Sequence, residues 1–175
     1  MIGRLAAVNM VWQYANWSCV PEIVRDGCLR PSNEKFKSGL PLVWFTADQL
    51  WDRTSAIDVF CSVRFGMRAS DARLVRSWQV LDGAGADATE FVATLLLTGA
   101  DRHDWFATAE AVPLSDLVFE VLLNDAGDWA ESLAHDGAAW KPADASTTAR
   151  ALLEDEGPVR AERNSRPCRR QPAVS

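Results

Sequence analysis

Two stretches rich in aromatic and β-branched residues, joined by a short helical pattern, constrain the fold of this chain most. Residues 8–15 (VNMVWQYA) have the composition of a strand, and residues 40–46 (LPLVWFT) predict a second strand that ends in a hydroxyl. Between them, residues 17–26 carry apolar side chains at helical spacing, with Ser18 as an N-cap and Gly27 as the stop. The order predicted is strand, short helix, strand.

Polar side chains lie among aromatic rings near the ends of both predicted strands. Gln13 and Tyr14 close the first strand, and Thr46 follows Trp44 in the second. Since ligands gather at strand ends in split sheets, we expect a cleft for a flat ligand between the two strands. The loop that follows, with Trp51, is expected to lie over this cleft.

The remaining chain predicts more strands than helices. Residues 59–67 alternate with a period of two, residues 105–111 and 117–123 have strand composition, and residues 88–98 have the pattern of a helix. Because regular strand–helix–strand alternation is missing, we expect an α+β fold: a single domain with a mixed or antiparallel split sheet and a few short helices.

The composition changes near residue 143. No aromatic residue follows Trp140, and Arg, Glu, Pro, Ala and Ser dominate. Such a segment buries too little apolar surface to offset the entropy of ordering it. We therefore expect one domain over residues 1–143 and a disordered tail over residues 144–175, apart from one helix near residues 148–155.

Charge and cysteine spacing exclude several classes of function. A net charge of −6 disfavours general coating of nucleic acid, which needs a basic footprint. The four cysteines form no C-x-x-C pair, so we expect reduced thiols and no metal site. No apolar run is long enough to cross a membrane. These observations predict a cytoplasmic protein without a membrane partner.

One charged pair stands out among the predicted strands. Glu120 is the only charge in residues 117–123, and alternation places Arg64 on the face of Phe60 and Ser62. Burying an unpaired glutamate in an apolar strand is costly. Glu120 therefore faces solvent at an edge, pairs with Arg64, or is kept for function.

The pattern Ile23-x-x-x-Gly27-x-Leu29-x-Pro31-Ser32, followed by a strand that ends in an aromatic residue and Thr46, resembles a known family. It is similar to the opening of the ADP-ribosyltransferase-like superfamily, which includes toxin-type transferases and RNA 2′-phosphotransferases. The resemblance covers residues 8–55.

The resemblance implies that the protein binds NAD or a related nucleotide and modifies a protein or nucleic-acid acceptor. In that superfamily the first strand carries an Arg or His, the second a Ser, Thr or Tyr, and a late strand or loop a glutamate. The positions that match by order are Gln13, Thr46 and Glu120. The implied catalytic residues are Glu120 and Thr46, and the implied nucleotide-binding residues are Gln13, Tyr14, Trp44, Trp51 and Arg64.

Gln13 departs from the family pattern and leaves three alternatives open. An amide hydrogen-bonds to a ribose or carboxamide but supplies no charge for a pyrophosphate. An enzyme therefore needs another cation, such as Arg30 or Arg64. Without one, the chain is a non-enzymatic binding or interaction module of the phage- or defence-associated kind. The third alternative is a different fold, in which the aromatic strands form a sandwich.

Overall fold

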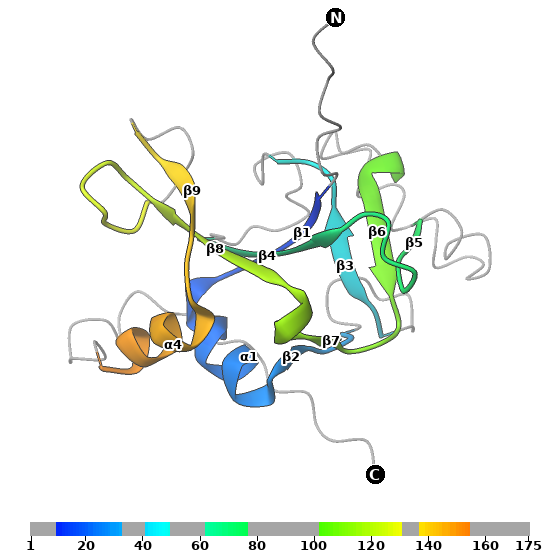
Figure 1. The fold of residues 1–175 in the computed structure, drawn as a ribbon, viewed down its shortest axis with the longest axis horizontal. Helices are drawn as coiled ribbons and strands as arrows, with labels where there is room; N and C mark the ends of the chain where they lie inside the picture. Colours follow the sequence, from blue (N-terminus) through cyan, green and yellow to red (C-terminus); the bar gives the residue numbers. More distant parts are fainter. Residues whose placement is uncertain (1–9, 33–40, 50–61, 77–101, 131–136, 155–175) are drawn as a thin grey trace, which may run out of the picture.

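An antiparallel sheet forms the centre of the structure (Figure 1). The computed structural model describes residues 10–32, 41–49, 62–76, 102–130 and 137–154. Within these residues the main sheet has seven strands in the order β5-β6-β3-β1-β4-β8-β9. Their bounds are β1 (Met10–Ala15), β3 (Val43–Thr46), β4 (Val63–Arg68), β5 (Val75–Arg76), β6 (Trp105–Thr108), β8 (Val118–Leu123) and β9 (Ala139–Pro142).

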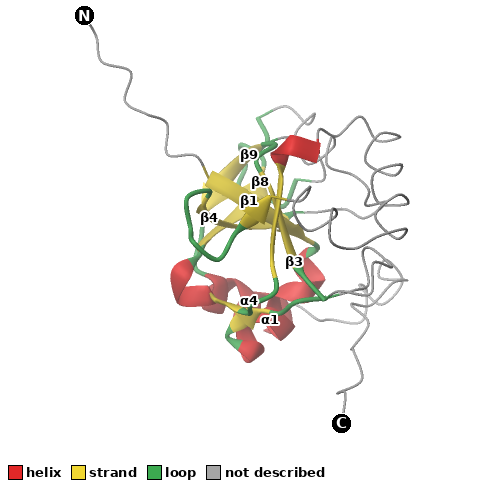
Figure 2. Ribbon diagram, turned by 90° about the vertical axis from the view of Figure 1, so that its right-hand side faces the viewer, coloured by secondary structure: helices red, strands yellow, loops and turns green. Residues whose placement is uncertain are grey.

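Short elements complete the described part of the chain. A second, two-stranded sheet pairs β2 (Cys28–Leu29) with β7 (Val112–Pro113). The α-helices are α1 (Val20–Asp26) and α4 (Ala145–Glu154), and the 3-10 turns are η1 (Trp17–Cys19), η2 (Arg102–Asp104) and η3 (Leu114–Asp116). Figure 2 shows α1 and α4 together on one side of the strands. The expected α+β fold with an antiparallel sheet is confirmed.

The main sheet changes direction between β1 and β3. These two strands share the register pair Trp12↔Thr46, whereas β1 and β4 pair along their whole length, from Met10↔Arg68 to Ala15↔Val63. In Figure 1, β3, β5 and β6 stand upright while β4 and β8 run across the view. The junction of β1 and β3 is therefore where the two halves of the sheet diverge.

The two faces of the sheet have different chemistry because side chains alternate along each strand. One face packs against α1 and α4 and supplies the main core, including Val11, Phe45, Phe65 and Val121. We call the opposite face the tryptophan face. It carries Trp12, Tyr14, Trp44, Thr46, Arg64, Glu120 and Trp140.

Local sequence signals account for α1 and its entry turn. The side-chain oxygen of Asn16 accepts a hydrogen bond from the Ser18 backbone N–H at 2.9 Å, so Asn16 rather than Ser18 caps this segment. Pro21 stands in the first turn of the helix, where its missing N–H costs nothing. Gly27 ends the helix in the left-handed region with a φ of 68° and donates its N–H to the Val24 carbonyl.

The helix α4 extends the core beyond the expected domain boundary at residue 143. Its first turn is capped by Asp144, whose carboxylate accepts a hydrogen bond from the Thr147 backbone N–H at 2.6 Å. Ala149 and Leu152 are buried against the same core as β1 and β4. The one helix expected in the tail, near residues 148–155, is thus present at Ala145–Glu154, and it is packed because α1 supplies an apolar surface for it. Residues 155–175 lie outside the described part.

The cysteines differ from expectation at one position. Cys19 ends η1 and is disulfide-bonded, whereas Cys28, at the start of β2, carries a free thiol. The expectation that the thiols are reduced is therefore wrong for Cys19. Spacing along the chain does not reveal which distant thiols a fold brings together.

Candidate functional site

A buried ion pair lies at the centre of the tryptophan face. Arg64 and Glu120 are directly opposite each other on the neighbouring strands β4 and β8. The Nε atom of Arg64 donates to Oε2 of Glu120 at 2.7 Å, and Nη2 contacts the same oxygen. The two side chains are 8% and 15% exposed, so little solvent screens their attraction. The expected alternative in which Glu120 pairs with Arg64 is the one observed.

Two indole rings enclose the arginine of this pair. The Cζ atom of Arg64 lies 3.8 Å from the ring centroid of Trp12 and 4.5 Å from that of Trp140. Tyr14 packs against Trp140 with 5.7 Å between ring centroids. A planar guanidinium keeps its hydrogen bonds at the edge while its faces stack on aromatic rings. We call Trp12, Tyr14, Arg64, Glu120 and Trp140 the arginine cluster; it draws on β1, β4, β8 and β9.

Hydrogen bonds tie the turn after β3 to the arginine cluster. The Tyr14 hydroxyl donates to the Asp48 carbonyl at 2.9 Å, and Nη1 of Arg64 donates to the Gln49 side-chain oxygen at 3.3 Å. The hydroxyl of Thr46 is buried and accepts from the Asp48 backbone N–H at 3.0 Å. Thr46 therefore shapes the turn that ends β3, and this turn fixes the rim of the cluster.

The structure brings most, but not all, of the expected site residues to one face. Trp44 lies on the same face as Thr46 and packs edge-on against Trp105, with 6.4 Å between ring centroids. Trp51 lies outside the described residues. The residues that share the tryptophan face are Tyr14, Trp44, Thr46, Arg64 and Glu120.

Gln13 lies on the other face of the sheet. It pairs with Phe65 of the main core, and its side-chain Nε2 donates to the Tyr14 carbonyl at 3.1 Å. Thr46 instead pairs with Trp12, one residue earlier in β1. Because adjacent side chains of a strand point to opposite faces, Gln13 and Thr46 do not line one pocket. The expectation that they do is wrong.

Trp12 and Trp140 belong to the site although the sequence argument did not select them. Trp12 could have been predicted from the sequence, because it stands two residues before Tyr14 and side chains two residues apart in a strand share a face. Trp140 lies in a four-residue edge strand that ends at Pro142 and has little periodicity of its own. Only its pairing with Leu122 of β8 brings it to the cluster.

The Trp12 ring packs directly over a glycine on the neighbouring strand β4. Gly66 pairs with Trp12, and a Cβ atom built on Gly66 would overlap with the ring carbons of Trp12. We expect Gly66→Ala to lower the free energy of unfolding by about 2 kcal/mol through overpacking, as measured by urea denaturation. In a Trp12→Leu background the same change should cost much less. An equal cost in both backgrounds would contradict this packing argument.

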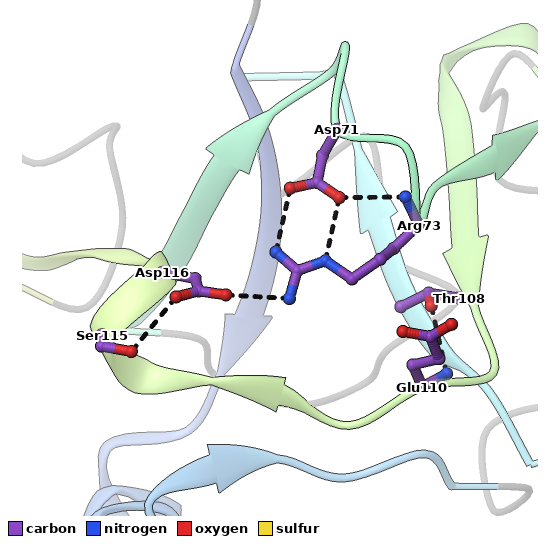
Figure 3. A network of polar contacts seen from close by, with 6 residues as sticks. All are labelled: Asp71, Arg73, Thr108, Glu110, Ser115 and Asp116. Carbon is purple, nitrogen blue, oxygen red and sulfur yellow. Dashed lines mark hydrogen bonds and ion pairs between the residues drawn. The ribbon is translucent and has the colours of Figure 1, made fainter.

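A second polar network joins the turn after β4 to η3 (Figure 3). Figure 3 shows the Arg73 guanidinium facing Asp71 on one side and Asp116 on the other. All of these charge-assisted hydrogen bonds are 2.9 Å long. A separate turn is held by the Glu110 backbone N–H, which donates to the Thr108 hydroxyl. The network links segments that are distant in sequence.

This network makes the free energy of unfolding depend on pH. Hydrogen bonds from the side chain and backbone of Arg73 lower the pKa of Asp71 from 3.8 to about 2. Since the pKa is lower in the folded state, the carboxylate stabilises the fold above pH 3.8, and this contribution is lost as the pH falls from 3.8 towards 2.

Replacing Asp71 with Asn should therefore have a pH-dependent effect. At neutral pH we expect a loss of about 1 kcal/mol, because the pair is partly open to solvent. The difference between variant and wild type should shrink below pH 3.8 and vanish only below about pH 2. Urea denaturation at several pH values checks this, and a difference that is constant with pH would contradict it.

Within the described ranges, no group of three or more His, Cys, Asp or Glu side chains is arranged to hold a metal ion. No helix among those residues is long and apolar enough to cross a membrane. Fold and site define an α+β protein whose antiparallel sheet carries a stacked, buried arginine–glutamate pair. Comparison with protein-family models, curated proteins and solved structures finds no match for this chain.

Proposed function

We propose that this chain is an ADP-ribosyltransferase-like protein that binds NAD or a related nucleotide at the tryptophan face, beside the junction of β1 and β3. The observation that carries the proposal is that Tyr14, Thr46 and Glu120 lie on one face. They come from the first strand, the second aromatic strand and a late strand, although the first-strand position that matches the family by order, Gln13, lies on the other face. The acceptor would be a protein or a nucleic acid.

The chemistry proposed for Glu120 follows from its charge. Cleaving the bond between nicotinamide and ribose develops positive charge on the sugar, and a nearby carboxylate stabilises that charge. The aromatic rings beside Glu120 are flat apolar surfaces, and the guanidinium of Arg64 stacks on those of Trp12 and Trp140. Arg64 is the cation nearest to this carboxylate, and Arg30 is instead exposed and paired with Asp26.

The non-enzymatic alternative has a specific observation in its favour. Arg64 donates two contacts to Glu120 and a third hydrogen bond to Gln49, so the two charges neutralise each other. In this arrangement Glu120 holds Arg64 rather than facing an open ligand position. A module that binds a nucleotide without cleaving it is compatible with such a pair.

Calorimetric titration with NAD, followed by chromatography for released nicotinamide, tests both candidates. A transferase binds NAD and releases nicotinamide, and Glu120→Gln stops the release in the fraction that remains folded. A binding module takes up NAD and releases nothing. Gln13→Ala is a matched control, because Gln13 lies on the other face and should leave NAD affinity unchanged. Absence of heat with NAD and with ADP-ribose would overturn both candidates.

A further inference from the structure

The helix α4 is attached to the rest of the fold by apolar contacts. The last polar contact before it is at Ala143, whose backbone N–H donates to the Phe119 carbonyl of β8 at 3.0 Å. The hydrogen bond from the Thr147 N–H to the Asp144 carboxylate is local to the first turn. Among the residues that the structure describes, no hydrogen bond or ion pair joins residues 145–154 to another element. Apolar packing alone therefore holds α4 in place.

This apolar attachment is small. Of the ten residues of α4, the buried ones are Ala149 and Leu152. The side chain of Leu153 is 58% exposed and adds nothing to the contact. Because the stabilisation by apolar burial grows with the area removed from water, two buried side chains give α4 a weak hold.

The contact between α4 and the sheet is also incompletely filled. A cavity of about 250 Å³ lies between the helix and β8. Val121, Leu123 and Trp129 line it from the side of β8 and the turn after it, and Leu152 lines it from α4. Atoms that line a void lose the dispersion attraction of the missing neighbours. The cavity thus weakens the packing that holds α4.

A helix of this length does not persist without its docking surface. Isolated helices shorter than about 12–15 residues are marginal in water, and α4 has ten residues. When α4 leaves the core, its backbone N–H groups therefore become open to exchange with solvent. The ladder between β1 and β4, which runs from Met10↔Arg68 to Ala15↔Val63, contains no residue of α4 and stays paired.

We infer that α4 is a cover that opens as a unit, hinged at residues 143–144, while the seven-stranded sheet stays folded. Opening uncovers the apolar side chains of Val121, Leu123 and Trp129 around the cavity. The inference goes beyond the proposed function, because α4 packs on the face of the sheet opposite the tryptophan face.

Hydrogen–deuterium exchange of the full chain, followed by nuclear magnetic resonance, tests this inference. Conditions are chosen in which the exchange rate reports the opening equilibrium. We expect the amides of α4 to exchange at least about tenfold faster than those of β1 and β4, with a weaker dependence on urea, because opening exposes less surface than global unfolding does. Equal rates with equal dependence on urea would overturn the inference.

Val43→Ala separates the opening of α4 from global unfolding. Val43 is buried in β3, and β1 and β4 lie between β3 and β8 in the sheet. Truncating it should make exchange in β1 and β4 about tenfold faster, because the whole fold becomes less stable. Exchange in α4 should stay unchanged. If α4 becomes faster by the same factor, it opens only with the whole fold, and the inference is wrong.

Leu152→Ala and Leu153→Ala form a matched pair within α4. Leu152→Ala destabilises the closed state relative to the open and the unfolded states, so exchange in α4 should become about a hundredfold faster. Leu153→Ala should leave it unchanged, because Leu153 is exposed. If Leu152→Ala does not accelerate exchange in α4, its amides exchange without undocking, and the inference is overturned.

Discussion

Replacing Glu120 with Gln is expected to lower the free energy of unfolding by about 3 kcal/mol, because it leaves a buried cation without its counter-charge. The Arg64 side chain is 8% exposed, so water cannot make up for the lost negative charge, although the amide oxygen of Gln can still accept a hydrogen bond from Arg64. The indole rings of Trp12 and Trp140 still stabilise the cation through stacking but do not neutralise its charge. Urea denaturation followed by circular dichroism measures the change.

Two further variants make this result specific to a buried pair. Replacing both partners, Arg64→Met with Glu120→Leu, should recover most of the stability, since apolar side chains of similar size often replace buried ion pairs without loss. Glu22→Gln breaks the exposed pair with Arg25 and should cost less than about 0.5 kcal/mol. Similar losses for Glu120→Gln and Glu22→Gln would contradict the role of burial.

The same substitution at Glu120 bears on function. Unchanged stability together with loss of nicotinamide release would assign the carboxylate to catalysis. A marked loss of stability, with nicotinamide release unchanged in the fraction that remains folded, would make the ion pair with Arg64 its main role.

Leu152→Ala is expected to destabilise the fold by about 3 kcal/mol, because it removes a buried side chain from the α4 contact with the core. Leu152 also lines a cavity of about 250 Å³ between β8 and α4, which the substitution would enlarge. Enlarging a cavity adds to the cost of removing apolar atoms. Thermal and urea denaturation of the variant measure the loss.

The neighbouring residue in the same helix is a matched control. Leu153 is 58% exposed, so Leu153→Ala keeps the same chemistry and helix propensity but should change stability by less than about 0.5 kcal/mol. If both substitutions cost equally little, α4 is not docked on the core, and the domain ends near residue 143 as the composition suggested.

Several elements followed from local patterns. The strands at residues 10–15, 43–46, 63–68 and 118–123 lie within one to three residues of the expected ones at the ends that the structure describes. Gly27 stops α1 as expected, because glycine adopts a positive φ without steric cost. Period-two alternation also placed Arg64 on its observed face.

The sequence reduced the number of candidate site residues but did not predict which of them lie together. Alternation and the cost of burying Glu120 left pairing with Arg64 among a few alternatives, and the β4–β8 register selected it. Gln13 was assigned to the same pocket as Thr46, which the β1–β3 register rules out. Trp140 was absent from the expected site because β9 has no strong pattern of its own.

The sequence by itself determined the local conformations: which segments are extended, where α1 stops, and which side chains of one strand share a face. These depend on neighbours along the chain, whose sterics and alternation are written in a few consecutive residues. The tertiary structure alone decided how the strands align and that α4 docks beside α1. Register and docking depend on contacts between distant segments, and a shift of one residue moves a side chain to the opposite face. That is the physical reason why Thr46 faces Trp12 rather than Gln13, and why the arginine cluster forms only in the folded sheet.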